Sequence, residues 1–176
     1  MTPFIPAVLI AGERLDKDHP RLEALGQLDE LNVFVGAVRT GLSTDATVPA
    51  ALRDVLEAEL RSLQERLVDL GAAIAQRSTA TVPTGSQRAE LERSLSAMER
   101  ELSPPARPIL PGGVPTTARL HMCRAICDRA ERSVVALARR EAIAEPLLEY
   151  VGRLSAWFLA AARVVAAGTE KEWLYA

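Results

Sequence analysis

Cysteine and histidine are scarce in this chain of 176 residues, which contains two of each. The cysteines, Cys123 and Cys127, lie four residues apart in a segment with helical spacing. They form no disulfide framework, and with only His19 and His121 beside them no zinc-binding set can be assembled. We therefore expect no metal site, and we expect both cysteines to be small apolar core residues.

An excess of charge of either sign is also missing. The chain has 21 Lys and Arg against 23 Asp and Glu, a formal net charge of −2. This balance gives no electrostatic reason to expect nucleic acid or an anionic membrane surface as a partner. No apolar run approaches the roughly 20 residues that span a bilayer, and the short apolar segment at residues 1–11 lacks the basic start of a secretory signal. We expect a cytoplasmic protein whose residues 1–11 pack on its body or at a subunit contact.

No alternating segment is long enough to be a convincing strand, whereas apolar residues recur every three or four positions in five segments. This spacing predicts five helices packed nearly parallel to one another. The residues expected to open or stop them are, in chain order, Asp18 with Pro20, Pro49, Ser86, Pro104 with Pro105, Thr116 or Thr117, and Pro146. With loops at 78–86 and 103–116, residues 1–176 are expected to form one all-α domain, a single five-helix bundle.

Polar residues also follow helical spacing. Four of them, separated by three, four and three positions, share one face of the fourth helix: His121, Arg124, Asp128 and Glu131. A solvated face with an Arg124–Asp128 pair would look the same, so that interpretation stays open. In the first helix, Asp29 and Asn32 interrupt an apolar pattern, where a polar group is costly without a partner. An arginine such as Arg124 would suit Asp29 as that partner.

Several motifs carry a family resemblance. Residues 12–32, GERLDKDHPRLEALGQLDELN, resemble the first helix of the PduO-type ATP:cob(I)alamin adenosyltransferases. The segment PILPGGVPTTARLHMCRAICDRAERSVVAL resembles that family's FxLPGG…LHxAR…RRAER signature. LQERLVDLGAAIA and YVGRLSAWFLAAAR are similar to its IQxxLFDLGxxLA and NRLSDxLFxxAR. The matches cover nearly the whole chain in order, and they imply the family's helical bundle and a homotrimer with active sites between subunits.

In that family, cob(I)alamin attacks the 5′ carbon of ATP and expels triphosphate. The resemblance implies that Asp29 and Arg124 pair beside the corrinoid pocket, and that Lys17 and Arg21 remain from the nucleotide site. Residues 1–11, however, contain no glycine and no run of hydroxyls where the family has its triphosphate loop, TxTGDxGxT. Asp128 stands at the first arginine of RRAER, and an anion there repels a polyphosphate, although Arg129 could reach round.

Other family positions are changed as well. Pro108 stands where the family has the phenylalanine that fills the lower face of the corrin, and Gly152 and Ala156 replace the asparagine and aspartate of NRLSD, while Arg153 is kept. These departures all fall on ligand contacts. They favour a repurposed protein that no longer uses ATP, requires no cofactor, and binds a small apolar or cyclic organic ligand in the cleft between subunits.

In this interpretation the protein is a cofactor-independent acid/base or electrostatic catalyst of a specialised biosynthetic pathway. Asp128 is the expected catalytic residue, with Arg124 and His121 beside it, although pairing with Arg124 or Arg132 at the surface would explain it equally well. The expected ligand-binding residues are Asp29, Asn32, Pro108, Glu131, Arg129 and Arg153. Two alternatives stay open: an adenosyltransferase with an altered nucleotide site, using cobalamin, ATP and Mg²⁺, or a non-catalytic corrinoid- or tetrapyrrole-binding protein.

Overall fold

The structure is a computed structural model that describes residues 7–8, 12, 14–104, 108–166 and 171–172. It contains five helices: α1 (Pro20–Thr44), α2 (Ala50–Gln76), α3 (Gly85–Glu101), α4 (Pro115–Ala138) and α5 (Glu145–Ala166). The predicted all-α five-helix bundle is confirmed, and the two longer loops each end two residues earlier than expected. The expected segment at residues 1–11 lies mostly outside the described residues.

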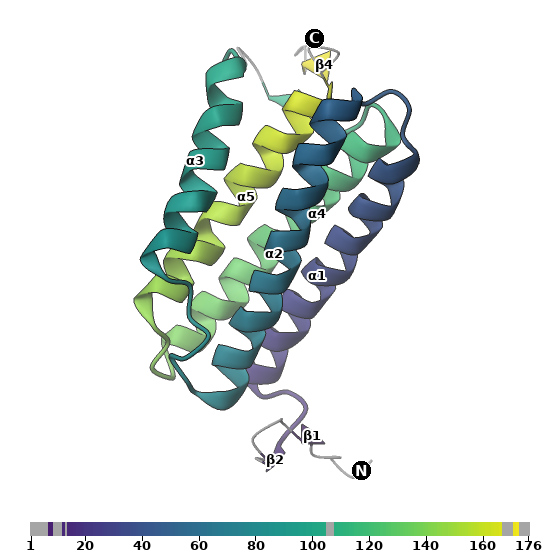
Figure 1. The fold of residues 1–176 in the computed structure, drawn as a ribbon. Coiled ribbons are helices and arrows are strands. Elements are labelled where there is room, and N and C mark those ends of the chain that lie inside the picture. The colour runs from purple at the N-terminus through teal and green to yellow at the C-terminus, as the bar shows by residue number, and fades with distance from the viewer. Residues whose placement is uncertain (1–6, 9–11, 13, 105–107, 167–170, 173–176) are drawn as a thin grey trace, which may run out of the picture.

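The helices lie side by side and alternate in direction along the bundle (Figure 1). α1 packs against α2 and α4, and α5 packs against α4 and α3. Two short antiparallel ladders lie at opposite ends (Figure 1): β1 (Ala7–Val8) pairs with β2 (Arg14–Leu15), and β3 (Ile109–Leu110) pairs with β4 (Lys171–Glu172). The first ladder therefore precedes α1, and the second joins the segment before α4 to the segment after α5.

Prolines decide where α1 and α4 begin. Each helix starts at a proline, whose fixed φ suits the first turn and whose missing N–H is not needed there. The cap is therefore the preceding residue, His19 for α1 and Val114 for α4. The Nδ1 atom of His19 accepts a hydrogen bond from the Arg21 backbone N–H at 3.1 Å. The predicted caps Asp18 and Thr116 or Thr117 were wrong, because Asp18 precedes the cap of α1 and the two threonines follow Pro115 inside α4.

The cap of α3 also differs from the predicted Ser86. Thr84 caps this helix, and its hydroxyl accepts from the Gln87 N–H at 3.3 Å. The Gln87 side chain in turn accepts from the Thr84 N–H at 2.8 Å. This reciprocal capping box satisfies two N–H groups of the first turn, which a cap at Ser86 could not do with the same glutamine.

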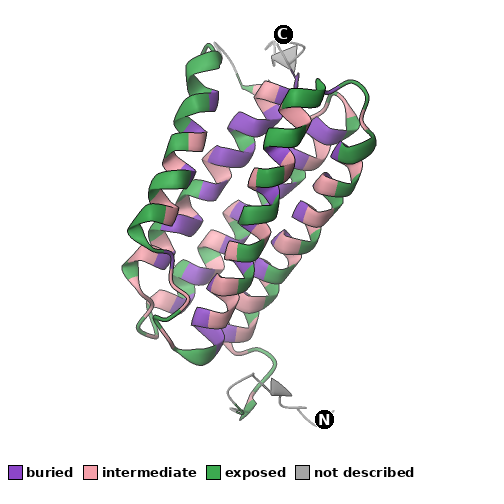
Figure 2. Ribbon diagram, viewed as in Figure 1, coloured by how far each residue is buried: buried purple, intermediate pink, exposed green. Residues whose placement is uncertain are grey.

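The core runs the length of the bundle, with buried positions facing inward on every helix (Figure 2). Trp157 and Phe158 stack edge to face at 5.3 Å between ring centroids, and the Trp157 indole donates to Ser94 Oγ at 2.8 Å. Cys123 and Cys127 are fully buried, which confirms their predicted core role. Burial raises the pKa of the Cys123 thiol to about 12 and raises that of Cys127 as well, so both stay protonated at neutral pH.

A hydrogen-bond network fixes the connection between α1 and α2 onto the start of α4. The Thr116 hydroxyl donates to Asp45 Oδ2 at 2.6 Å, and the Thr47 N–H donates to Asp45 Oδ1 at 3.1 Å. The Thr116 bond, followed by those from Thr47, lowers the pKa of the Asp45 carboxyl. A charged acceptor makes these bonds stronger than neutral ones.

Candidate active site

The polar stripe predicted on α4 changes from buried to exposed along the helix. His121 is buried near the start. Arg124 and Asp128, one turn apart, form an ion pair with 3.2 Å between Nη1 and Oδ2, and about a third of each side chain is exposed. Glu131 is half-buried against α5, where its Oε1 lies 3.3 Å from the position that a Cβ on Gly152 would occupy. The interpretation of Asp128 as a partner of Arg124 therefore agrees with the geometry.

An open groove of about 480 Å³ continues this stripe toward the end of α4. Its lining residues are Asp128, Glu131, Arg132, Val135 and Ala136 of α4 and Arg139, the residue that follows this helix. Arg132 and Arg139 form no ion pair with any residue that the structure describes. The sequence analysis did not select these two as site residues, although positions 128, 132, 135 and 139 follow helical spacing and extend the same stripe.

The predicted pair of Asp29 and Arg124 does not form in the described chain. The buried seam of α1 runs through Leu28, Leu31 and Val35, and Asp29 lies beside it with an exposed side chain. Arg124 bonds to Asp128 instead, because that carboxylate is one turn away on its own helix.

Asn32 lies closer to the core than Asp29 does. Its backbone oxygen accepts from Gln64 Nε2 of α2 at 3.0 Å. Its side-chain Oδ1 is buried and has no hydrogen-bond partner within the described residues. An unpaired buried acceptor carries a desolvation cost, so a donor supplied from outside this chain would be favoured there.

Arg129 points toward α1 rather than into the groove. Its guanidinium donates to Gln27 Oε1 and to Glu30 Oε2, both on α1. These bonds lie on the exposed seam between the two helices. Arg129 is therefore held away from Asp128, and in this chain it does not offset the negative charge of that residue.

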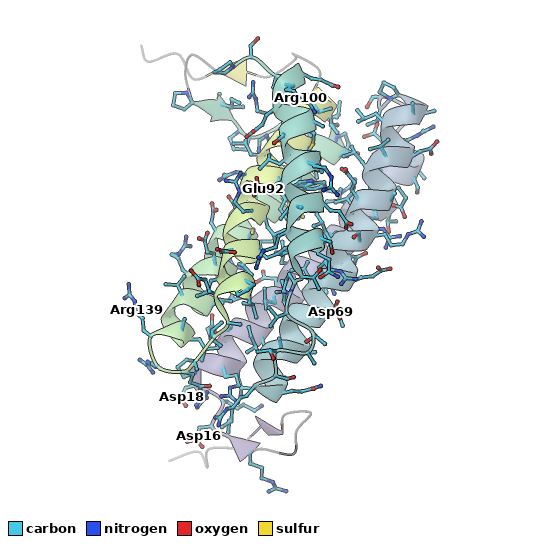
Figure 3. The ribbon with its side chains drawn as sticks, turned by 60° about the vertical axis from the view of Figure 1, so that its left-hand side comes forward. Asp16, Asp18, Asp69, Glu92, Arg100 and Arg139 are labelled. Atoms are coloured by element: carbon cyan, nitrogen blue, oxygen red, sulfur yellow. The ribbon has the colours of Figure 1, made fainter. Side chains whose placement is uncertain are left out.

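The structure places Arg153 and Pro108 apart from the α4 stripe. Arg153 donates to Glu92 of α3, with 3.0 Å between Nη2 and Oε2, so it joins α3 to α5 (Figure 3 labels Glu92). Pro108 is exposed and directly precedes β3, ahead of α4. The predicted ligand-binding residues therefore do not converge on one place within the described part of a single chain.

The two residues predicted to remain from a nucleotide site, Lys17 and Arg21, lie at the start of α1, at the opposite end of the bundle from β3 and Pro108. Lys17 is exposed in the turn before α1, between Asp16 and Asp18, which Figure 3 shows toward the same end as Arg139. Arg21, by contrast, is 0% exposed and forms an ion pair with Glu141, just after α4. It therefore joins two helix ends, and Lys17 is the one of the two that is accessible to a ligand.

No group of three or more His, Cys, Asp or Glu side chains among the described residues could hold a metal ion. Within the same part of the chain, no helix has the length and apolar character needed to cross a membrane. The α4 groove offers two arginines, Arg132 and Arg139, that form no ion pair within the described chain, a feature suited to an anionic ligand. Asp128, which also lines the groove, is the residue that pairs with Arg124.

Known proteins resemble this chain over most of its length. The family described as cobalamin adenosyltransferase matches residues 7–165. A corrinoid adenosyltransferase of Bacillus subtilis is 40% identical over 159 residues, covering 89% of this chain and 79% of that protein. A cobalamin adenosyltransferase of Cupriavidus metallidurans is 36% identical over 154 residues, 88% of this chain and 79% of that protein.

A solved structure gives the same result in three dimensions. It is a variant of a PduO-type ATP:corrinoid adenosyltransferase from Lactobacillus reuteri, complexed with cobalamin and ATP. Its TM-score is 0.82 at 31% sequence identity, and the alignment covers 97% of this chain and 91% of that one.

These comparisons correct the main functional expectation. The expectation of a repurposed protein that no longer uses ATP is wrong, since relatives between 30 and 40% identical are named corrinoid or cobalamin adenosyltransferases. The expectation that no cofactor is required is not supported either, because solved neighbours contain cobalamin and ATP. The physical error was to treat the Asp128 substitution in isolation. Arg124 compensates that carboxylate locally, and Arg132 and Arg139 keep cationic groups in the adjacent groove.

Proposed function

Because this chain belongs to the cobalamin adenosyltransferase family, we propose that it is an enzyme that transfers the adenosyl group of ATP to a reduced corrinoid. Cobalt(I) supplies the electron pair for a new bond to the 5′ carbon of ATP. The bond from that carbon to the triphosphate oxygen breaks, and triphosphate leaves with its electron pair. The observation that carries this proposal is the 40% identity to the Bacillus subtilis corrinoid adenosyltransferase over 89% of the chain.

Arg132 and Arg139 are the groups that we assign to the triphosphate. Both line the α4 groove without an ion pair among the described residues, so their charge is available to a polyanion. Lys17, exposed toward the same end of the bundle, adds a third cation. Mg²⁺ would accompany ATP as part of the substrate, because polyphosphates bind it through their own oxygens.

Arg124 and Asp128 would position the substrates rather than bind triphosphate directly. Their ion pair cancels most of the charge of Asp128, which lowers its repulsion of a nearby polyanion. His121, buried one turn before Arg124, and Glu131, packed on α5, support this face from either side.

A homotrimer would complete the corrinoid side of the site. Val33 on α1 and Met122 on α4 are large apolar side chains exposed by 64% and 48%, and contact with a further copy would bury them. Asp29, exposed four residues before Val33, would then lie at a subunit contact, and the Asn32 acceptor could be paired from it. Pro108 would contact the corrinoid as the resemblance implies. We place the reaction in the cytoplasm, where ATP is supplied.

The proposal is tested by incubating the purified protein with ATP, Mg²⁺ and chemically reduced cobalamin under anaerobic conditions. The visible spectrum should change to that of adenosylcobalamin, with release of triphosphate. Arg132→Ala and Arg139→Ala should each raise the KM for ATP about tenfold or more, since each removes a charge-assisted contact. Arg93→Ala, an exposed arginine on α3, is the matched control and should behave as wild type. No product, in an assay in which the Bacillus subtilis relative turns over, would refute the proposal.

A further inference from the structure

A second hollow lies on another side of the bundle, where α2 and α3 face each other over α5. Its volume is about 240 Å³, slightly below the roughly 300 Å³ at which drug-sized pockets begin. Its apolar lining comes from all three helices and includes Leu63, Leu91 and Trp157. None of the residues of the α4 groove takes part in it. The hollow is therefore separate from the proposed adenosyl-transfer site.

Tyr150 presents a buried polar group to this hollow. Its side chain is only 3% exposed and lines the hollow. Its hydroxyl makes no hydrogen bond to any residue that the structure describes. Burial raises the pKa of Tyr150 to about 12, with a lowering influence from Arg66 and a raising one from Glu90. Arg66 on α2 and Glu90 on α3 line the same hollow as Tyr150, so they are the charged groups beside it there.

The charges around the hollow favour a cation. Glu59 on α2 and Glu90 on α3 both line it, and neither forms an ion pair with the described residues. Arg66 also lines it, but Asp69 compensates its charge with 2.9 Å between Nη1 and Oδ2. Two uncompensated carboxylates therefore remain beside one neutralised arginine. A positively charged group is attracted to such a lining, and an anion is repelled.

We propose that this hollow binds a small organic cation: an ammonium group carried on an apolar body about the size of one ring. The body packs on Leu63, Leu91 and Trp157, and the ammonium donates hydrogen bonds to the Tyr150 hydroxyl and to the carboxylates at the rim. This inference does not depend on the proposed adenosyl transfer, since it uses different residues on a different side of the bundle.

The Trp157 indole is a direct reporter of the hollow, because its N–H is held by Ser94 Oγ at the lining. The experiment follows the indole N–H signals of ¹⁵N-labelled protein by NMR, with Trp157→Phe identifying the Trp157 signal. Benzylamine is the probe, protonated at neutral pH, and benzyl alcohol and benzoate are its neutral and anionic counterparts. Benzylamine should shift the Trp157 signal and saturate, benzyl alcohol should bind at least about tenfold more weakly, and benzoate should produce no shift.

Two variants locate the binding. Tyr150→Phe keeps the ring and removes only the hydroxyl, so benzylamine should bind about tenfold more weakly with an unchanged melting curve. Ser62→Trp, at an exposed position of α2 in the lining, should fill the hollow and abolish the shift. Adenosyl transfer should stay unchanged in both. Absence of a saturable shift with benzylamine, equal affinity for benzyl alcohol or benzoate, or undiminished binding by Tyr150→Phe would each overturn the proposal.

Discussion

Arg124 donates to Asp128 across one turn of α4, with 3.2 Å between Nη1 and Oδ2. The family that this chain resembles has an arginine where Asp128 stands. Two cations one turn apart are therefore replaced in this chain by an ion pair between Arg124 and Asp128. The two charges largely cancel, and neither is fully exposed. In the proposed function, the charge that binds phosphate on this face is consequently that of Arg132 and of Arg139, which follows the end of the helix.

Asp128→Arg should lower the KM for ATP about tenfold, because it replaces a compensated anion with a cation beside the groove. The new arginine lies one turn from Arg124, and like charges at this spacing cost a few tenths of a kcal/mol of stability. Asp128→Asn is the matched control that removes the negative charge without adding a positive one. It should give a smaller decrease. Steady-state kinetics at varied ATP measures both, and a higher KM in Asp128→Arg would contradict the assignment of this groove to triphosphate.

Glu141→Ala should destabilise the fold strongly because it removes a carboxylate that pairs with the buried Arg21 guanidinium. Arg21 is 0% exposed, and breaking a buried pair from one side costs about 3 kcal/mol or more. Glu92→Ala provides the comparison, since its pair with Arg153 is nearly half exposed on both sides and should cost less than about 1 kcal/mol. Urea unfolding at neutral pH measures the free energy of unfolding of both variants. Equal losses would contradict the prediction that the buried pair of Arg21 contributes more to stability than the exposed pair of Arg153.

Thr116→Val should cost about 1 kcal/mol at neutral pH by removing the hydrogen bond to Asp45 Oδ2. The pKa of Asp45 is lowered in the folded state, chiefly by that hydrogen bond. The stabilisation is therefore present above the unfolded-state pKa of about 3.9. It is lost as the pH falls through the lower folded-state pKa, so the difference between wild type and variant should shrink there.

Thr117→Val is the control for this pH dependence. Thr117 is also buried at the start of α4, but its hydroxyl has no partner among the described residues. Its replacement should be neutral or slightly stabilising at every pH. Urea unfolding from pH 7 down to pH 3 distinguishes the two variants. A penalty in Thr116→Val that stays constant down to pH 3 would mean that the Asp45 carboxylate is not what the hydroxyl stabilises.

Gly152→Ala tests how firmly Glu131 is held against α5. Alanine in a helix interior is favoured over glycine by up to about 1 kcal/mol, but a Cβ here would approach Glu131 Oε1 to 3.3 Å. Gly71→Ala on α2 meets only an ordinary contact, 3.8 Å from Leu25 Cδ2. Both variants should raise the melting temperature, Gly152→Ala by less. A lower melting temperature in Gly152→Ala would mean that the Glu131 carboxylate cannot move aside.

The sequence was sufficient to predict the helices because their apolar seams are regular, as the buried row Leu28, Leu31 and Val35 shows. It predicted less well the features that depend on a single residue, namely the exact start of a helix and the direction of one side chain. A proline, not a hydroxyl, determines the starts of α1 and α4, and the outward direction of Asp29 follows from a one-position offset beside the seam.

The candidate site was predicted only in part, because spacing gives a shared face and not a partner. The four residues His121, Arg124, Asp128 and Glu131 all lie on α4, at the spacing that predicted a shared face. The sequence could not show that Arg153 lies apart from these four residues. Its partner is Glu92, 61 residues earlier in the chain, and residue spacing does not predict a contact over that distance. This chain differs from the family at Asp128 and Pro108. The effect of these differences on ligand binding could not be judged from the sequence, because it depends on which charges the fold brings beside them.

The pairing of Ile109 with Glu172 and of Leu110 with Lys171 has a practical consequence. The segment that carries Pro108 into α4 is braced by residues that come after the last helix. Protein shortened after Ala166, or extended by a fusion partner there, would alter this brace while leaving every helix intact. Activity assays on such versions would report on a displaced loop, so purification handles should be kept away from that ladder.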